Sequence, residues 1–221
     1  MGTKKQQTRA QFITLEGVEG SGKSTHIRHL VDVLTKAGYR VLQTREPGGT
    51  ATAEAIRHIL LTASSHESLT PQAEALLILA ARSQHVTQLI MPALRRGAVV
   101  LCDRFSDSTF AYQGFARGLD LSWLRAANKV ATDGLTPDLT VVLDLPVSVG
   151  LARRQADRGR QNRLDRETER FHRKVRRGFL ALAAEEPGRI TIVNANRPAQ
   201  EVRDELTEIV LGWIARPRRR S

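Results

Sequence analysis

Residues 17–24 read GVEGSGKS, directly after the apolar run FITLE, and this arrangement restricts the possible folds more than any other part of the chain. It matches the P-loop pattern at Gly17, Gly22, Lys23 and Ser24. The glycines let the backbone turn so that successive N–H groups face an anion, and a helix that follows adds the positive end of its dipole. The stretch therefore predicts a phosphate site between a buried strand and a helix.

A P-loop places the contacts to a nucleoside triphosphate on one continuous segment. Lys23 is expected to neutralise charge on the β- and γ-phosphates, and the Ser24 hydroxyl is expected to ligate Mg²⁺. The predicted ATP-binding residues are Gly17, Val18, Glu19, Gly20, Ser21, Gly22, Lys23, Ser24 and Thr25.

Short, almost continuously apolar runs alternate with longer stretches of helical periodicity. The runs cover residues 12–17, 39–46, 98–104, 139–145 and 190–196, and helical patterns cover roughly 51–62 and 71–96. Continuous apolar character is typical of strands buried on both faces, which occur in parallel sheets with helices above and below. We therefore predict an α/β fold of the P-loop NTPase type, with a doubly wound, mainly parallel sheet of about five strands and helices on both faces.

Length and composition fit one domain. The chain has 221 residues, of which 41% are apolar, so it can bury a sizeable core. A single cysteine, Cys102, excludes an intramolecular disulfide and favours a reducing compartment, and no apolar stretch is long enough to span a bilayer. We expect a cytoplasmic protein with a flexible N-terminal extension at 1–11, one domain at 12–214 and a basic tail at 215–221.

The net charge of +11 allows two interpretations, a nucleic-acid binder or a basic enzyme that attracts small anions. Eleven Arg and Lys residues lie within residues 153–177, against four acids. These cations are interspersed with acids and lack the interleaved aromatic residues of single-strand binders, so no specific nucleic-acid partner is expected. Only tight DNA binding at physiological salt would favour the first interpretation.

Asp103 and Arg104 end the third apolar run, LCDR. An aspartate at the carboxyl end of a strand can hold Mg²⁺ or its waters, so the predicted metal residues are Ser24 and Asp103. Arg104 can bind a second phosphate. Two phosphate-binding groups that face each other indicate transfer between two nucleotides rather than hydrolysis.

Four stretches together resemble the bacterial thymidylate kinases, P-loop kinases that act on nucleoside monophosphates. They are FITLEGVEGSGKST, TREPGGT (44–50), DRFSDSTFAYQG (103–114) and PDLTVVLDL (137–145). The resemblance extends from about residue 11 to residue 213. It implies transfer of the γ-phosphoryl group of ATP to dTMP with Mg²⁺, giving dTDP and ADP for dTTP synthesis, commonly in a homodimer.

The resemblance also implies roles for individual residues. Glu19 would face the sugar and phosphate of the substrate, Arg57 and Arg104 would bind the dTMP phosphate, and Arg82 would hydrogen-bond the thymine edge. The implied substrate-binding residues are Arg45, Glu46, Pro47, Arg57, Ile78, Arg82, Arg104, Ser108, Tyr112 and Gln113. One position departs from the family, because Ile78 stands where a phenylalanine usually stacks on thymine.

Residues 153–167 read RRQADRGRQNRLDRE and are expected to form a short Arg-rich lid. The variable P-loop positions contain no arginine, which resembles the family subtype whose catalytic arginine comes from the lid. The predicted catalytic residues are Lys23, Glu19, Arg104, Arg153, Arg158, Arg160 and Arg163. Each lid arginine, taken singly, fits a solvated helix face equally well.

Two other functions remain open from the residues. One is a P-loop kinase that acts on another nucleoside monophosphate or on a deoxynucleoside, which the REPGGT and AYQG stretches disfavour. The other is a nucleotide switch or nucleic-acid-binding module that uses the arginines of 153–177.

Overall fold

Five strands form one parallel sheet, as the sequence predicts, and their order is β2-β3-β1-β4-β5. The computed structural model describes residues 10–62, 68–156, 163–164 and 167–216. The strands are β1 Gln11–Glu16, β2 Val41–Arg45, β3 Val99–Asp103, β4 Leu139–Asp144 and β5 Ile190–Asn194. The P-loop strand β1 lies in the centre, between β3 and β4.

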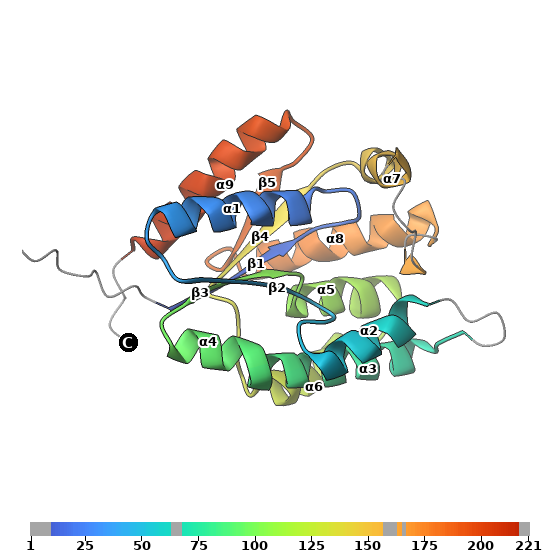
Figure 1. The fold of residues 1–221 in the computed structure, drawn as a ribbon. Coiled ribbons are helices and arrows are strands. Elements are labelled where there is room, and N and C mark those ends of the chain that lie inside the picture. Colours follow the sequence, from blue (N-terminus) through green and yellow to red (C-terminus); the bar gives the residue numbers. More distant parts are fainter. Residues whose placement is uncertain (1–9, 63–67, 157–162, 165–166, 217–221) are drawn as a thin grey trace, which may run out of the picture.

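Helices cover both faces of this sheet, with α1 and α9 above it and α4, α5 and α6 below it in the view of Figure 1. In chain order the helices are α1 Lys23–Lys36, α2 Ala51–Leu61, α3 Pro71–His85, η1 Val86–Ile90, α4 Met91–Arg95, α5 Ser106–Thr109, η2 Phe110–Ala116, α6 Leu121–Thr132, α7 Val147–Ala156, α8 Glu169–Glu185 and α9 Ala199–Ile214. The sheet is therefore doubly wound.

The structure differs from the sequence prediction in two local respects. The helix expected over 71–96 runs from α3 through the π-helical turn η1 into α4, and Thr70 caps it by accepting a hydrogen bond from Ala73 N. The outer strands β2 and β5 carry exposed residues, whereas β1 is buried throughout. Burial on both faces was expected for all strands, but edge strands have a neighbour on one side only.

Polar residues gather where the parallel strands end. The register pairs Leu15 of β1 with Asp103 of β3, and pairs Asp103 in turn with Arg45 of β2. The carboxyl ends of these strands therefore lie at the same edge of the sheet, where ligands bind in open α/β folds. No helix of the described residues is long and apolar enough to cross a membrane.

Candidate functional site

The loop between β1 and α1 wraps around the ammonium group of Lys23. Lys23 Nζ donates to Gly17 O and Val18 O, each at 3.0 Å, and to Ser21 Oγ at 3.2 Å. Burial, and then the charge of Arg104, lowers the pKa of Lys23 from 10.5 to about 8, so the side chain stays mostly protonated at neutral pH. The loop thus holds a positive charge at the start of α1, where the helix dipole adds to it.

The same loop is packed tightly against α7. Gly20 has a φ of 71°, and a Cβ built there would lie 2.0 Å from Gly150 O of α7. A Cβ on Gly150 would in turn lie 2.5 Å from Glu19 O. Only glycine at both positions permits this approach, which fixes the helix that leads into the predicted lid against the P-loop.

Ser24 and Asp103 meet although they are far apart in the sequence. Ser24 Oγ donates to Asp103 Oδ2 at 2.7 Å. A hydroxyl and a carboxylate oxygen suit Mg²⁺, which takes one or two protein ligands and keeps several waters. The predicted pair therefore fits the ion, although the described residues contain no cluster of three or more His, Cys, Asp or Glu that could hold a metal.

Arg104 leaves the end of β3 with a left-handed backbone, at a φ of 69°. Its guanidinium turns toward the P-loop, where Nη1 donates to Gly17 O at 3.0 Å and Nη2 donates to Glu19 Oε1 at 3.1 Å. Burial lowers the pKa of Arg104, but Tyr112 and Glu19 outweigh this effect and raise the pKa above its usual value. Arg104 is therefore a fixed positive charge beside the loop.

Glu19 is the partner of this charge. Tyr112 Oη donates to Glu19 Oε1 at 2.6 Å, and His172 Nδ1 lies 3.0 Å from Glu19 Oε2. Burial raises the pKa of Glu19, but Arg104 and His172 outweigh it and hold this pKa well below its usual range. Glu19 therefore remains ionised and orients both Arg104 and Tyr112.

Glu16, at the end of β1, is a buried carboxyl group that the sequence analysis did not single out. Phe105 N donates to Oε1 at 2.7 Å and Ser108 Oγ donates to Oε2 at 2.5 Å. Burial, and then the charge of Asp107, raises the pKa of Glu16 from 4.5 to about 7. Glu16 thus anchors the segment that carries Ser108 beneath Arg104.

This raised pKa predicts a pH dependence of stability. Because the folded protein binds the Glu16 proton more tightly than the unfolded chain, the free energy of unfolding should fall as the pH rises from 4.5 to 7. The contribution is about 3 kcal/mol in total. Denaturant unfolding at several pH values measures this effect. The free energy of unfolding should decline less steeply with pH in Glu16→Gln than in the parent, whereas Glu201→Gln, at an exposed position, should match the parent. Equal slopes for Glu16→Gln and the parent would contradict the prediction.

Beside the P-loop lies a cavity that is partly open to solvent. Eight of the ten predicted substrate-binding residues line it, namely Glu46, Pro47, Ile78, Arg82, Arg104, Ser108, Tyr112 and Gln113. Phe105, Thr109 and Leu164 also line it and were not predicted. The structure therefore brings together residues from the β2–α2 loop, from α3, from the β3–η2 segment and from the segment before α8 around one space.

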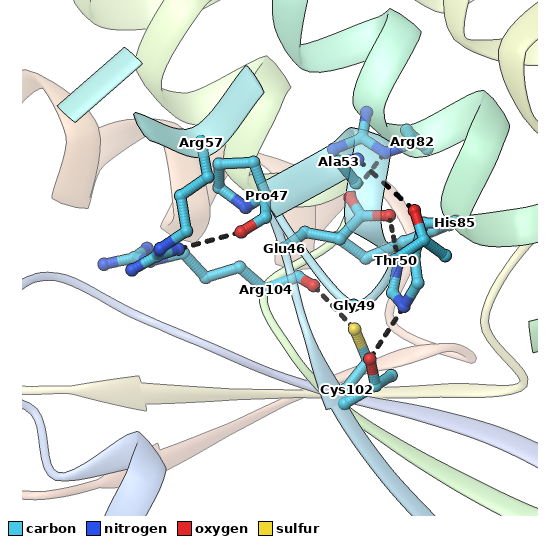
Figure 2. A network of polar contacts seen from close by, with 12 residues as sticks. Glu46, Pro47, Gly49, Thr50, Ala53, Arg57, Arg82, His85, Cys102 and Arg104 are labelled. Atoms are coloured by element: carbon cyan, nitrogen blue, oxygen red, sulfur yellow. Dashed lines mark hydrogen bonds and ion pairs between the residues drawn. The ribbon is translucent and has the colours of Figure 1, made fainter. Parts of the chain in front are cut away.

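The two other predicted residues lie outside the lining. Arg45 Nη2 donates to both carboxylate oxygens of Glu54, at 2.9 and 3.0 Å, on the protein surface. Arg57 Nη1 donates to Pro47 O at 2.9 Å, next to the cavity wall, as Figure 2 shows. Arg57 thus stands at the rim, whereas Arg45 supports the loop through Glu54, which also accepts a hydrogen bond from Gly49 N at 2.9 Å.

The end of the cavity away from the P-loop carries directed polar groups against an aromatic ring. Arg82 is 1% exposed, donates from Nη1 to Asn128 Oδ1 at 2.8 Å, and lies 5.0 Å above the centre of the Phe105 ring. The Thr109 hydroxyl is buried without a hydrogen-bond partner among the described residues. A sequence pattern does not reveal the stacking of Arg82 on Phe105 or the burial of the Thr109 hydroxyl, because Phe105 and Thr109 are positioned by the turn between β3 and α5 and by α5 itself.

The predicted lid arginines have different positions. Arg153 Nη1 donates to Ala195 O at 3.1 Å, and Arg163 donates to Leu60 O at 3.0 Å and pairs with the buried Glu74. Glu74 was not predicted, and it also accepts from Gln113 at 2.7 Å. Arg158 and Arg160 lie outside the described residues.

Comparisons with known proteins agree on one family. The family described as thymidylate kinase matches residues 15–206. The thymidylate kinase of Pseudomonas fluorescens (strain Pf-5) is 51% identical over 207 residues, which cover 94% of this chain and 98% of the relative. The thymidylate kinase of Trichlorobacter lovleyi is 49% identical over 211 residues, covering 93% and 99%. A crystal structure of thymidylate kinase from Ehrlichia chaffeensis is similar with a TM-score of 0.73 at 32% identity, covering 91% and 98%.

Proposed function

The chain belongs to the thymidylate kinase family and transfers the γ-phosphoryl group of ATP to dTMP, and we propose that its P-loop and the adjacent cavity hold the two nucleotides end to end. One observation carries the proposal. Arg104 lines the cavity and at the same time donates to Gly17 O of the P-loop, so the two binding regions meet at this side chain. Transfer between nucleotides requires that the donor and acceptor phosphates meet in this way.

On the donor side, the amides of residues 17–25 and the ammonium of Lys23 bind the phosphates of ATP. Ser24 and Asp103 would hold Mg²⁺, which when bound supplies positive charge that stabilises the transferring phosphoryl oxygens. The 2.7 Å contact between their oxygens supports this assignment, because both then face the same point.

On the acceptor side, Arg104 binds the phosphate of dTMP and Arg57 closes on it from the rim. Glu19 keeps Arg104 oriented, and Tyr112, bound to the same carboxylate, stands where the sugar would lie. The chemical step needs little covalent work from the protein, so positioning and fixed charge are the main contributions of these side chains.

At the far end of the cavity, Arg82 and Thr109 read the polar edge of the thymine ring. Arg82 Nη2 donates to no acceptor among the described residues, and the Thr109 hydroxyl is equally unused. Phe105 and Ile78 form the apolar part of the pocket wall. A donor and a hydroxyl that lack protein partners in a buried pocket are suited to a ligand's carbonyl and N–H groups.

The lid assignment remains a proposal for residues 153–167, within a kinase domain at 12–214. The packing of α7 against the P-loop through Gly20 and Gly150 supports it, since Arg153 follows Gly150 by three residues on the same helix. Arg163 reaches Glu74 beside the acceptor cavity, so the two ends of the segment lie against the two binding regions.

We also propose a homodimer in the cytoplasm. Exposed apolar side chains lie on three neighbouring helices, with Ile59 on α2 at 52%, Leu76 on α3 at 56% and Val130 on α6 at 84% exposure (Figure 1). A second copy that packs against these three helices would remove such side chains from water. Sedimentation equilibrium tests this, and a monomer for the parent chain at micromolar concentration would contradict it. The single thiol, Cys102, is free and buried, which is compatible with a reducing compartment.

The function is tested by ADP release from ATP with dTMP, dUMP, UMP, CMP, AMP and GMP as separate acceptors. We expect dTMP to be the best acceptor and the activity to vanish when EDTA removes Mg²⁺. A preference for any other monophosphate, or ADP release without an acceptor at the same rate, would overturn the assignment.

Ile78 offers a further prediction, because it lines the cavity near Phe105. Ile78→Phe should lower the KM for dTMP by about threefold, since an aromatic contact to the base is worth roughly 0.5–1.5 kcal/mol more than an aliphatic one. Steady-state kinetics with ATP saturating measures the change, and Ile192→Phe on the edge strand β5, where Ile192 is exposed, is the control. An unchanged or raised KM would remove Ile78 from the base pocket.

A further inference from the structure

A chain of buried polar side chains lies behind Arg82 and joins α3 to the end of β2 (Figure 2). Glu46 Oε2 accepts from Arg82 Nε at 2.7 Å, and Glu46 Oε1 lies 3.0 Å from His85 Nδ1. His85 Nε2 is 2.7 Å from Thr44 Oγ1. The exposure of these side chains is 9% or less, so each depends on its protein neighbours.

One neutral form of His85 satisfies both of its neighbours. The Glu46 carboxylate can only accept, so the ring must carry a proton on Nδ1 and donate it. Nε2 then accepts from the Thr44 hydroxyl, and no second charge is required beside the Arg82–Glu46 pair. Thr44 thus donates to His85, and His85 and Arg82 both donate to Glu46, so the hydrogen bonds converge on a carboxylate that lines the cavity.

This series fixes the plane of the Arg82 guanidinium. Glu46 holds Nε, Asn128 holds Nη1, and Phe105 lies beneath the group. The remaining nitrogen, Nη2, is the one available to the cavity. If Glu46 turned, the Nε contact would be lost and the plane would be held at only one atom.

His85 also supports the loop that reaches the phosphate rim. Gly49, at a φ of 89°, lies so close that a Cβ on it would be 2.5 Å from His85 Nε2. The same loop carries Pro47, whose carbonyl binds Arg57. A single buried side chain therefore contacts both the carboxylate behind the base pocket and the loop beside the phosphate.

We propose that His85 is a positioning residue for recognition of the nucleobase. It holds Glu46 in the rotamer that directs Arg82 Nη2 toward the carbonyl at C4 of thymine. A guanidinium only donates, so it favours a carbonyl there and disfavours the amino group that cytosine has at the same position. The inference rests on the proposed function, because it takes the cavity as the dTMP site.

The test compares two amides at one position in the full-length chain. His85→Gln places its amide near the Nε2 position and keeps a hydrogen-bond partner for Thr44. It removes the donor to Glu46 Oε1, while Arg82 still donates to Oε2. His85→Asn places its amide near Nδ1 and can still donate to Glu46. His29→Gln is the matched control. His29 Nε2 lies 3.1 Å from Thr207 Oγ1, and this contact is away from the site.

We expect His85→Gln to raise the KM for dTMP about tenfold, as for loss of a hydrogen bond to a charged group. The inhibition constant of dCMP and the KM for ATP should stay within about twofold of the parent values. The preference for dTMP over dCMP should therefore fall by about tenfold, the factor by which the KM for dTMP rises. His85→Asn should recover most of the dTMP affinity, and His29→Gln should match the parent. Equal weakening of dTMP, dCMP and ATP, or no recovery with Asn, would indicate a merely structural residue and overturn the proposal.

Two further variants keep the result interpretable. If His85→Gln fails to fold, Thr44→Val removes only the hydroxyl. It should raise the KM for dTMP about threefold, because the His85 ring is then held less firmly; an unchanged KM would overturn the proposal.

Arg82→Ala tests the assignment of the base pocket itself. A raised KM for dTMP in Arg82→Ala with no effect at His85 refutes only the positioning role, whereas no effect in Arg82→Ala refutes the assignment of the base pocket and this inference with it.

Discussion

Replacing Lys23 with alanine is expected to lower kcat by about three orders of magnitude, because fixed charges on transferring phosphates contribute on that scale. The ammonium stands inside the P-loop, with protons directed to Gly17 O, Val18 O and Ser21 Oγ. Its charge is therefore placed before the nucleotide arrives. Steady-state ADP release with saturating ATP and dTMP measures the loss.

Two checks separate chemistry from folding in this variant. Lys36→Ala removes the same group from the exposed last turn of the same helix and should leave kcat unchanged. The thermal midpoint should show whether the loop remains folded without its three internal hydrogen bonds. A kcat near that of the parent in a folded Lys23→Ala protein would mean that this loop does not hold the phosphoryl donor.

Replacing Arg104 with alanine is expected to lower kcat/KM for dTMP by about a thousandfold while the KM for ATP changes less than about threefold. Arg104 lines the cavity proposed for the acceptor, and its contacts with the P-loop are to the Gly17 carbonyl and the Glu19 carboxylate rather than to the anion-binding amides. Kinetics with each substrate varied in turn separate the two effects. An equal loss of ATP affinity would place this residue on the donor side.

The Arg104→Ala variant should also be less stable, by about 3 kcal/mol, because the largely buried Glu19 keeps its charge and loses its arginine partner. Glu19→Gln in the same chain should restore part of this stability without restoring turnover. Denaturant unfolding of the two variants measures the difference, and no recovery would indicate that the ion pair is not the source of the loss.

The fold followed from the sequence because its two strongest signals are local. A P-loop between an apolar run and a helical pattern places β1 and α1, and continuous apolar runs place the central strands. The sequence does not show how completely helices cover each face of a strand, so the exposed positions of β2 and β5 were not predicted. Edge position is decided by strand order, a property of the whole chain.

Most of the cavity lining was predicted from motifs, and the residues that support it were not. Glu16 lies at the end of an apolar strand, and its pKa is raised first by burial and then by the charge of Asp107, which is remote in the sequence. Glu74 appears as an ordinary first-turn acid of a helix until Arg163 and Gln113 are seen around it. Such roles arise from partners distant in sequence, which periodicity and spacing do not reveal.

The arginine at position 104 pairs with Glu19 although its backbone conformation is one that favours glycine. Its φ of 69° costs a residue with a Cβ about 1 kcal/mol, a cost that glycine does not have. Among inactive replacements, glycine should therefore be more stable than alanine by about that amount. A descendant that had lost its reaction and carried a neutral residue in place of Glu19 would have no ion pair to offset this cost, and position 104 would then be expected to drift toward glycine.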